Sequence, residues 1–228
     1  MIENFLVPFN ETVIKMIGWG ILETFYMVIG STVLAYVIGL PTGMLLIMTD
    51  RKGMHPMPKL NGALNFVVNI LRSVPFLILF IILMPTIRII VGKAYGPTAA
   101  MVALLIAAAP FVARLVEQSL QEVDGGVIEA AFSMGASPGT VLWKVMLPEA
   151  LPSLVNGCTI ASTTILGYSA MAGFMASGGL GDIAVKYGYN RWIFPVLVVS
   201  VILLVIIVQI MQEVGNRLTK RVDKRNIG

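Results

Sequence analysis

Charged residues are scarce in this sequence: they make up 12% of its 228 residues, whereas soluble domains carry about 25%. Hydrophobic residues account for 57%, and the mean hydropathy is +0.87. Long apolar segments with so few charges exclude a soluble domain and indicate an integral membrane protein. The segments are too long and too continuous for the alternating strands of a barrel, so we predict an all-α membrane fold.

Residues that commonly carry chemistry are almost absent. Cys158 is the only cysteine, which excludes an intramolecular disulfide and argues against a thiolate metal site. His55 is the only histidine, and it lies in a polar turn. The phosphate-binding pattern G-x-x-x-x-G-K-[ST] is missing, as are Ser-His-Asp sets and paired intramembrane carboxylates. We therefore predict a chain that is not an enzyme and binds no cofactor or metal itself.

Five apolar segments are long enough to cross a membrane, which takes about 20 residues. They cover residues 18–49, 60–91, 97–116, 151–176 and 193–212. Pro75 is expected to bend the second segment, because proline lacks an N–H and clashes with the preceding turn. Residues 177–192 are expected to form a glycine-rich loop. Residues 1–17 are weakly amphipathic, which favours a position along the membrane surface.

The positive residues predict the orientation, because they favour the cytoplasmic side. With the C-terminus inside, nine lie inside and four outside. The inside group is Arg51, Lys52, Lys59, Lys144, Arg217, Lys220, Arg221, Lys224 and Arg225; the outside group is Lys15, Lys93, Lys186 and Arg191. We predict an N-terminus outside and a C-terminus in the cytoplasm. The net charge of +4 comes from span ends and the tail, so it does not indicate a nucleic-acid partner.

A few charges fall within or beside the apolar segments, where they are costly and usually functional. Arg72 and Arg114 fall toward the predicted cytoplasmic side, and we expect them to extend to the interface, with substrate binding as the alternative. Glu23 and Glu117 lie near span ends, so no proton relay is predicted.

The stretch from Val127 to Pro148 is predicted to form two short helices with a kink. Asp124 is expected to cap the first helix, because its carboxylate can accept hydrogen bonds from free N–H groups. Gly135 suits the left-handed backbone that ends a helix. Ser137 and Pro138 are expected to begin the second helix as its N-cap and first residue, and Pro148 to end it.

The spacing of this stretch resembles the cytoplasmic coupling motif of ATP-binding-cassette importer permeases. Glu129-Ala130-Ala131, Gly135 and Leu147-Pro148 stand in register with it, and Val145 replaces an isoleucine. An ordinary amphipathic hairpin is the alternative interpretation. The resemblance implies that Glu129, Ala130, Ala131, Gly135, Leu147 and Pro148 contact an ATPase. The sequence pattern as a whole predicts an interfacial segment (1–17), a transmembrane domain (18–216) with a coupling loop (124–148), and a basic cytoplasmic tail (217–228), although the resemblance does not extend to residues 1–17.

Further runs resemble the methionine-import permeases: residues 72–76, 108–114, 166–173 and 187–189, and an outer loop with Gly178, Gly179, Gly181 and Asp182. The resemblance implies a permease for L- and D-methionine in the lipid of a bacterial inner membrane, working by alternating access. It implies a homodimer, a separate dimeric ATPase that uses ATP and Mg, and an extracytoplasmic methionine-binding lipoprotein. Two alternatives remain: a permease for another amino acid, and an ion-gradient carrier that needs no ATPase.

Four residues of the fourth segment suggest a gate on the outward side of the pathway. They recur at steps of four, three and four, so they are expected to share one helix face: Thr164, Tyr168, Met171 and Met175. Tyrosine and methionine side chains at a two-fold axis can form a hydrophobic constriction. Packing against other spans is the alternative interpretation.

Overall fold

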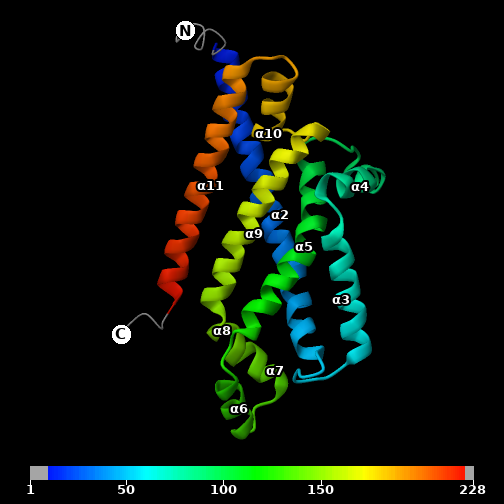
Figure 1. Cartoon of the computed structure of the whole chain (residues 1–228), viewed down its shortest axis with the longest axis vertical. Coiled ribbons are helices and arrows are strands. Elements are labelled where there is room, and N and C mark those ends of the chain that lie inside the picture. The colour runs from blue at the N-terminus through cyan, green and yellow to red at the C-terminus, as the bar shows by residue number, and fades with distance from the viewer. Residues whose placement is uncertain (1–9, 224–228) are drawn as a thin grey trace. The chain divides into compact units, whose positions relative to one another are not determined.

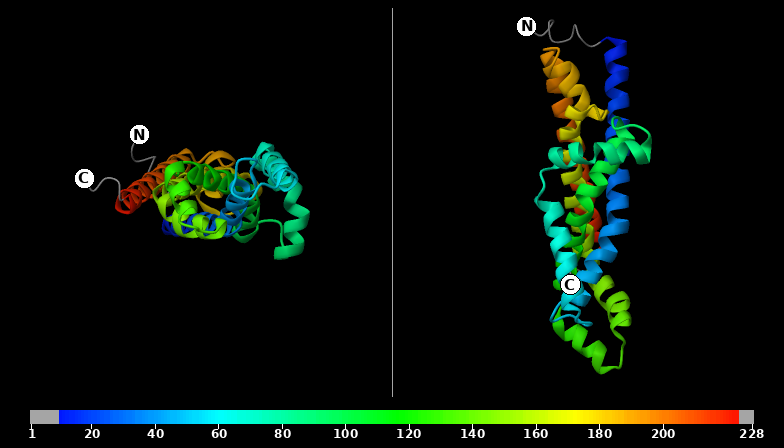
Figure 2. Two further views of the ribbon diagram at one scale, coloured as in Figure 1. Left: turned by 90° about the horizontal axis from the view of Figure 1, so that it is seen from below. Right: turned by 90° about the vertical axis from the view of Figure 1, so that its right-hand side faces the viewer.

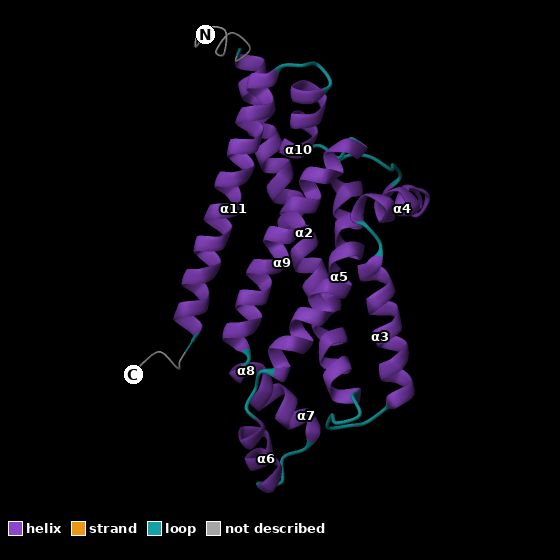
Figure 3. Cartoon of the chain, viewed as in Figure 1, coloured by secondary structure: helices purple, strands orange, loops and turns teal. Residues whose placement is uncertain are grey.

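The computed structural model describes residues 10–223, and all regular elements among them are helices (Figure 3). The predicted all-α fold is therefore confirmed. Residues 1–9 of the predicted interfacial segment and residues 224–228 of the predicted tail lie outside the described residues.

The longest helices are also strongly apolar. α2 (Glu11–Thr49), α5 (Pro97–Gln121) and α11 (Phe194–Val222) are each long and apolar enough to cross a membrane (Figure 1). α9 (Leu151–Ala172) has sufficient length, but hydroxyl residues and glycines interrupt its apolar sequence. The predicted span ends differ from the helix ends, because α2 already begins at Glu11 and α11 continues to Val222.

The second predicted segment is a broken pair, as Pro75 led us to expect. α3 (Pro58–Ser73) and α4 (Phe76–Val91) meet the requirements for a membrane span only when they are taken together. Between them Val74 is extended, with φ −82° and ψ 125°, because the ring of a following proline disfavours helical backbone. By length and composition, the described residues thus supply three spans, or four if this bent pair counts as one.

The chain forms two compact units, each assembled from three separate stretches. Unit 1 comprises Met1–Val33, Pro75–Ala107 and Ser162–Gln212, and unit 2 comprises Leu34–Val74, Ala108–Ala161 and Glu213–Gly228. The long helices α2, α5, α9 and α11 each contribute residues to both units. Each of these helices therefore has one part in unit 1 and another part in unit 2.

In unit 2, α2 approaches α5 closely at two glycines. A Cβ added at Gly39 would lie 2.6 Å from Cγ1 of Val112, and one added at Gly43 would lie 2.6 Å from the carbonyl oxygen of Ala113. The four-residue spacing of small residues is typical of tightly packed membrane helices. α3 follows the end of α2 through a short turn (Figure 2). Within this turn the Met57 N–H donates to the Thr49 carbonyl at 3.0 Å.

Candidate functional site

α6 (Gly125–Ser133) begins the predicted hairpin, and it follows α5 after three residues. The Asp124 carboxylate caps it by accepting hydrogen bonds from the backbone N–H groups of Gly126 (2.7 Å) and Val127 (3.4 Å). These groups have no partner within the helix, so the cap fixes where α6 starts. The predicted role of Asp124 is confirmed.

Gly135 ends α6 with a left-handed backbone, at φ +81°. Its N–H donates to the Phe132 carbonyl (2.8 Å), and the Ala136 N–H donates to the Ala131 carbonyl (3.1 Å). This pair of bonds is the Schellman arrangement, which satisfies the last carbonyls of a helix. The predicted backbone role of Gly135 is therefore confirmed, and the turn toward the second helix depends on it.

The second helix also begins as predicted. Ser137 caps α7 (Pro138–Val141) by accepting from the Thr140 N–H at 3.3 Å, and Pro138 is its first residue. The prediction that Pro148 ends this helix is wrong. The chain stays helical through a π-helical turn, η1 (Leu142–Met146), into α8 (Leu147–Glu149) and then α9. The wider π turn ends at Met146, two residues before Pro148, and accommodates a ring that would clash in an ordinary α-helix.

The hairpin of α6 and α7 exposes most of the residues that resemble the coupling motif. Glu129, Ala130, Gly135 and Pro148 are exposed, Leu147 is half-buried, and Ala131 is buried. The two alanines of the motif therefore point in different directions. Sequence reasoning missed Met134 and Trp143, whose side chains are 81% and 60% exposed. Both side chains are therefore available for contact with a partner.

The predicted outer loop is mostly helical, which corrects our expectation of a glycine-rich loop. α10 (Gly179–Ile183) continues into a π-helical segment, η3 (Ala184–Tyr189). Gly178 and Gly179 have φ +78° and +77°, a conformation that turns the chain into α10. The N–H groups of Gly179 and Leu180 donate to Glu23 Oε2 (2.7 Å) and Thr24 Oγ1 (2.9 Å) on α2, all within unit 1.

The other predicted outer-loop residues pack inside unit 1. A Cβ at Gly181 would lie 2.5 Å from the Ala170 carbonyl oxygen, so α10 lies directly against the end of α9. Asp182 is buried at 7% exposure and pairs with Lys186 at 2.8 Å. These residues therefore have structural roles in holding α10 against its neighbours.

The predicted gate residues do not all share one helix face. α9 ends at Ala172, and Met175 lies beyond it in a 3-10 turn, η2 (Gly173–Met175), so the α-helical spacing does not reach Met175. Tyr168 is stacked on Phe76 in unit 1. Thr164 is half-buried, whereas Met171 is 49% exposed.

Arg114 does not extend freely to an interface, which corrects the sequence-based expectation. Its guanidinium is held by Glu117, Asn65 and Asn69, all in unit 2. Arg72 is exposed, as expected for a side chain at the end of α3. The sequence did contain a sign of these partners. The asparagines of α3 recur at every fourth position, which places them on one face of the helix.

The structure combines apolar helices that can cross a membrane with a capped, exposed hairpin between the long helices α5 and α9. The chain belongs to the family of inner membrane components of binding-protein-dependent transport systems, whose sequence model matches residues 39–225. It is 47% identical over 203 residues to a "probable D-methionine transport system permease protein" of Vibrio cholerae, covering 89% of this chain and 90% of that one. It is 45% identical over 181 residues to a methionine import system permease of Bacillus subtilis, covering 79% and 82%.

The fold matches solved transporter structures as well. A chain of an inward-facing methionine ABC transporter superposes with a TM-score of 0.92 at 42% identity, covering 95% of this chain and all of that one. An amino-acid ABC transporter superposes with a TM-score of 0.76 at 17% identity, covering 91% and 94%, which shows the shared fold alone. The chain thus has the type I importer permease fold.

Proposed function

We propose that this chain is the membrane-spanning subunit of an ATP-driven importer for L- and D-methionine. The observation that carries the proposal is the hairpin of α6 and α7, whose capped backbone exposes Glu129, Ala130 and Gly135 in the register of the coupling motif. The names of the relatives supply the substrate, since they are methionine permeases at 45–47% identity.

The proposed assembly contains two copies of this chain, a dimeric ATPase on the cytoplasmic side and a methionine-binding lipoprotein outside. ATP and Mg²⁺ are bound and used by the ATPase subunits. The exposed side chains of Met134 and Trp143 support a contact between the hairpin and the ATPase. A second copy completes a pathway for which one chain of this size is small.

The connections of the hairpin explain how movement of an ATPase reaches the membrane helices. Three residues join α6 to α5, and a nearly continuous helical path joins α7 through η1 and α8 to α9 (Figures 1 and 2). Because both helix starts are capped and Gly135 fixes the turn, the hairpin can transmit a displacement with little bending. Such a displacement acts on α5 and α9 together, which is the movement that alternating access requires.

The distribution of charge between the units supports the proposed orientation. Of the basic residues in the described part of the chain, those assigned to the cytoplasm, such as Arg51, Lys144 and Arg217, belong to unit 2. Lys15, Lys93, Lys186 and Arg191, assigned to the outside, belong to unit 1. We therefore place the coupling hairpin in the cytoplasm and α10 outside.

Purification of the chain with its candidate partners tests this function. Co-expressed ATPase subunits should copurify with it, and ATP hydrolysis by the complex should change when methionine and the binding protein are added. An equimolar mixture of polar amino acids serves as the control ligand. Failure of the ATPase to copurify, or a response to the polar amino acids instead of methionine, would contradict the proposal.

A further inference from the structure

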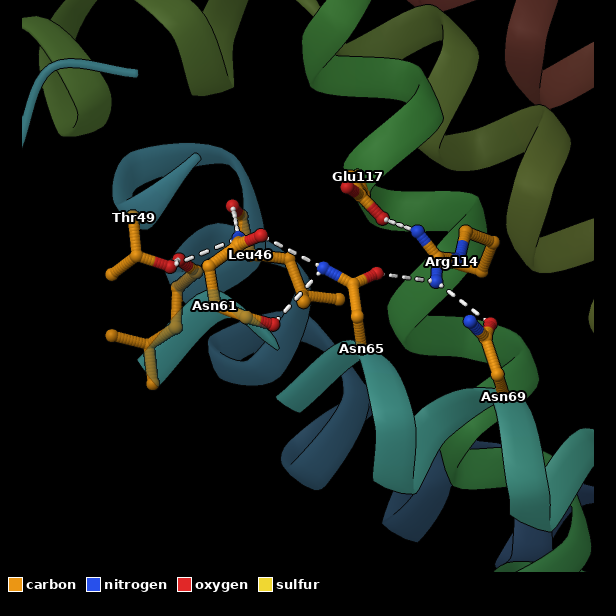
Figure 4. Close-up of polar contacts among 8 residues, drawn as sticks. Leu46, Thr49, Asn61, Asn65, Asn69, Arg114 and Glu117 are labelled. Atoms are coloured by element: carbon orange, nitrogen blue, oxygen red, sulfur yellow. Dashed lines mark hydrogen bonds and ion pairs between the residues drawn. The ribbon is translucent and has the colours of Figure 1, made fainter. Parts of the chain in front are cut away.

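Three asparagines form a polar row on α3 within unit 2. Asn61, Asn65 and Asn69 recur at every fourth position, so they share one face of the helix (Figure 4). We call these three residues the asparagine ladder. Apolar residues separate the three asparagines, so the contacts of this polar row with the neighbouring helices are informative.

One end of the ladder holds Arg114 of α5. Arg114 Nη2 donates to Oδ1 of Asn65 (2.8 Å) and to Oδ1 of Asn69 (3.0 Å), and Nη1 pairs with Glu117 at 2.5 Å (Figure 4). The side chains of Arg114 and Glu117 are only 20% and 8% exposed. The guanidinium therefore bridges its own helix and α3, an arrangement that suits its planar set of donors.

The other end of the ladder reaches the last turn of α2. Asn65 Nδ2 donates to the side-chain oxygen (2.9 Å) and carbonyl oxygen (3.0 Å) of Asn61. Asn61 Nδ2 in turn donates to the Leu46 carbonyl (2.8 Å) and to Thr49 Oγ1 (3.2 Å). Asn65 accepts from Arg114 and donates to Asn61, so one continuous chain of hydrogen bonds joins α5, α3 and α2 (Figure 4).

Such a network is expensive in a membrane protein. Burying an ion pair costs free energy because both ions lose their hydration, and apolar side chains of similar size often hold helices together equally well. Charged residues kept within membrane helices therefore usually have a functional role. The position of this network suggests the role, because Arg114 and Glu117 lie in the last turns of α5, just before the link to α6.

We infer that Arg114 and Asn65 are positioning residues that pass the movement of the coupling hairpin from α5 to α3. With the bonds from Arg114 to Asn65 and Asn69, the ends of α2, α3 and α5 in unit 2 move as one block. Without these bonds, α5 moves with the hairpin while α3 stays behind. This inference rests on the proposed function, since it requires an ATPase that moves α6.

The test is made in an Asn69→Leu background, which removes the second bond from Arg114 to α3. In that background it compares Asn65→Leu, which removes the remaining bond to Arg114, with Asn65→Asp, which keeps an acceptor for it. The readout is methionine taken up per ATP hydrolysed by the complete complex in proteoliposomes. We expect Asn65→Leu to lower this ratio by about fivefold or more while ATP hydrolysis continues, and Asn65→Asp to lower it less. Ser73→Ala is the matched control, because Ser73 bonds only to the Asn69 carbonyl of its own helix and should leave the ratio unchanged.

A purely structural role would give a different result. Uptake and hydrolysis would then fall together with the amount of complex, and an unchanged ratio in Asn65→Leu would overturn the inference. An equal fall of the ratio in Asn65→Leu and Asn65→Asp would also overturn it, because the acceptor for Arg114 would not matter.

A second readout needs no methionine. The labelling rate of Lys59→Cys, at the exposed start of α3, is measured in a Cys158→Ala, Asn69→Leu background with and without ATP. ATP should change this rate in the complex that has Asn65, and Asn65→Leu should abolish the change. If the complex that has Asn65 fails to import methionine but shows this change, the proposed substrate is wrong and the inference stands. If ATP leaves the rate unchanged, the inference is overturned.

Discussion

The ring of Tyr168 is stacked on the ring of Phe76, with centroids 5.1 Å apart and planes inclined by 6°. Phe76 is the first residue of α4, directly after the break at Pro75, so the stack fixes the start of α4 against α9 within unit 1. An aromatic pair of this kind contributes about 0.5–1.5 kcal/mol beyond the area that it buries. Tyr168 therefore packs against α4, and Met171, on the same face of α9, is the more exposed of the two gate candidates.

Met171→Ala tests the proposed gate in the assembled dimer. Shortening a half-exposed methionine should open a constriction at the two-fold axis and give a methionine leak that does not require ATP. Flux from preloaded proteoliposomes measures the leak. Ile160→Ala, at a similarly exposed position of α9, is the matched control and should not leak. Loss of protein from the membrane without any leak would show that Met171 serves packing.

Gly135→Val should disturb the hairpin through the backbone alone. A Cβ at Gly135 meets no atom within 4 Å, yet φ +81° strains any residue with a side chain, by about 1–2 kcal/mol. ATP-driven uptake should fall while the protein still inserts. Gly139→Val is the matched control, because its added Cβ also meets nothing within 4 Å and its φ is not positive. Equal uptake by the two variants would contradict the role of Gly135.

Thr24→Val should loosen α10 without changing the volume of the side chain much. It leaves the buried N–H of Leu180 without its acceptor, at a cost of about 1–3 kcal/mol. Hydrogen exchange at Leu180 should become faster than in the unsubstituted protein. Thr42→Val is the control, since Thr42 bonds only to the Ile38 carbonyl in its own helix. Unchanged exchange at Leu180 would show that this cap does not hold α10.

The orientation can be tested by labelling single cysteines in a Cys158→Ala background. Lys52→Cys and Lys220→Cys should be protected from an impermeant reagent in intact cells, whereas Asn190→Cys should react. All three positions are exposed in the structure, so protection reflects the side of the membrane. Asn190 is preferable to Lys186, which pairs with Asp182. The reverse labelling pattern would place the coupling hairpin outside the cell and overturn the proposed topology.

The parts of the site that the sequence predicted correctly depend on local chemistry. Asp124, Gly135 and Ser137 act on backbone groups within a few residues of themselves, so their roles follow from residue type and spacing. Pro75 breaks the second segment for the same local reason. The prediction for Pro148 was wrong because a π turn, which spacing alone does not reveal, makes room for its ring.

The parts that the sequence did not reveal depend on distant contacts. α10 is capped by Glu23 and Thr24, which lie 156 positions earlier in the chain. Arg114 is held by Asn65 and Asn69 on another helix, and this contact replaces the predicted extension to the interface. The regular spacing of the asparagines was visible in the sequence, but only the packing of α3 against α5 shows what they bind.

ATP-driven methionine uptake into proteoliposomes tests the central claim most directly. The complex of this chain with its ATPase and binding protein should accumulate methionine only when ATP is hydrolysed, and Glu129→Lys should reduce uptake because it reverses a charge on the exposed face of the hairpin. This chain alone should not accumulate methionine. Uptake by the chain alone with an ion gradient, or uptake and ATPase association that Glu129→Lys and Gly135→Val both leave unchanged, would contradict the claim that the hairpin couples ATP hydrolysis to transport.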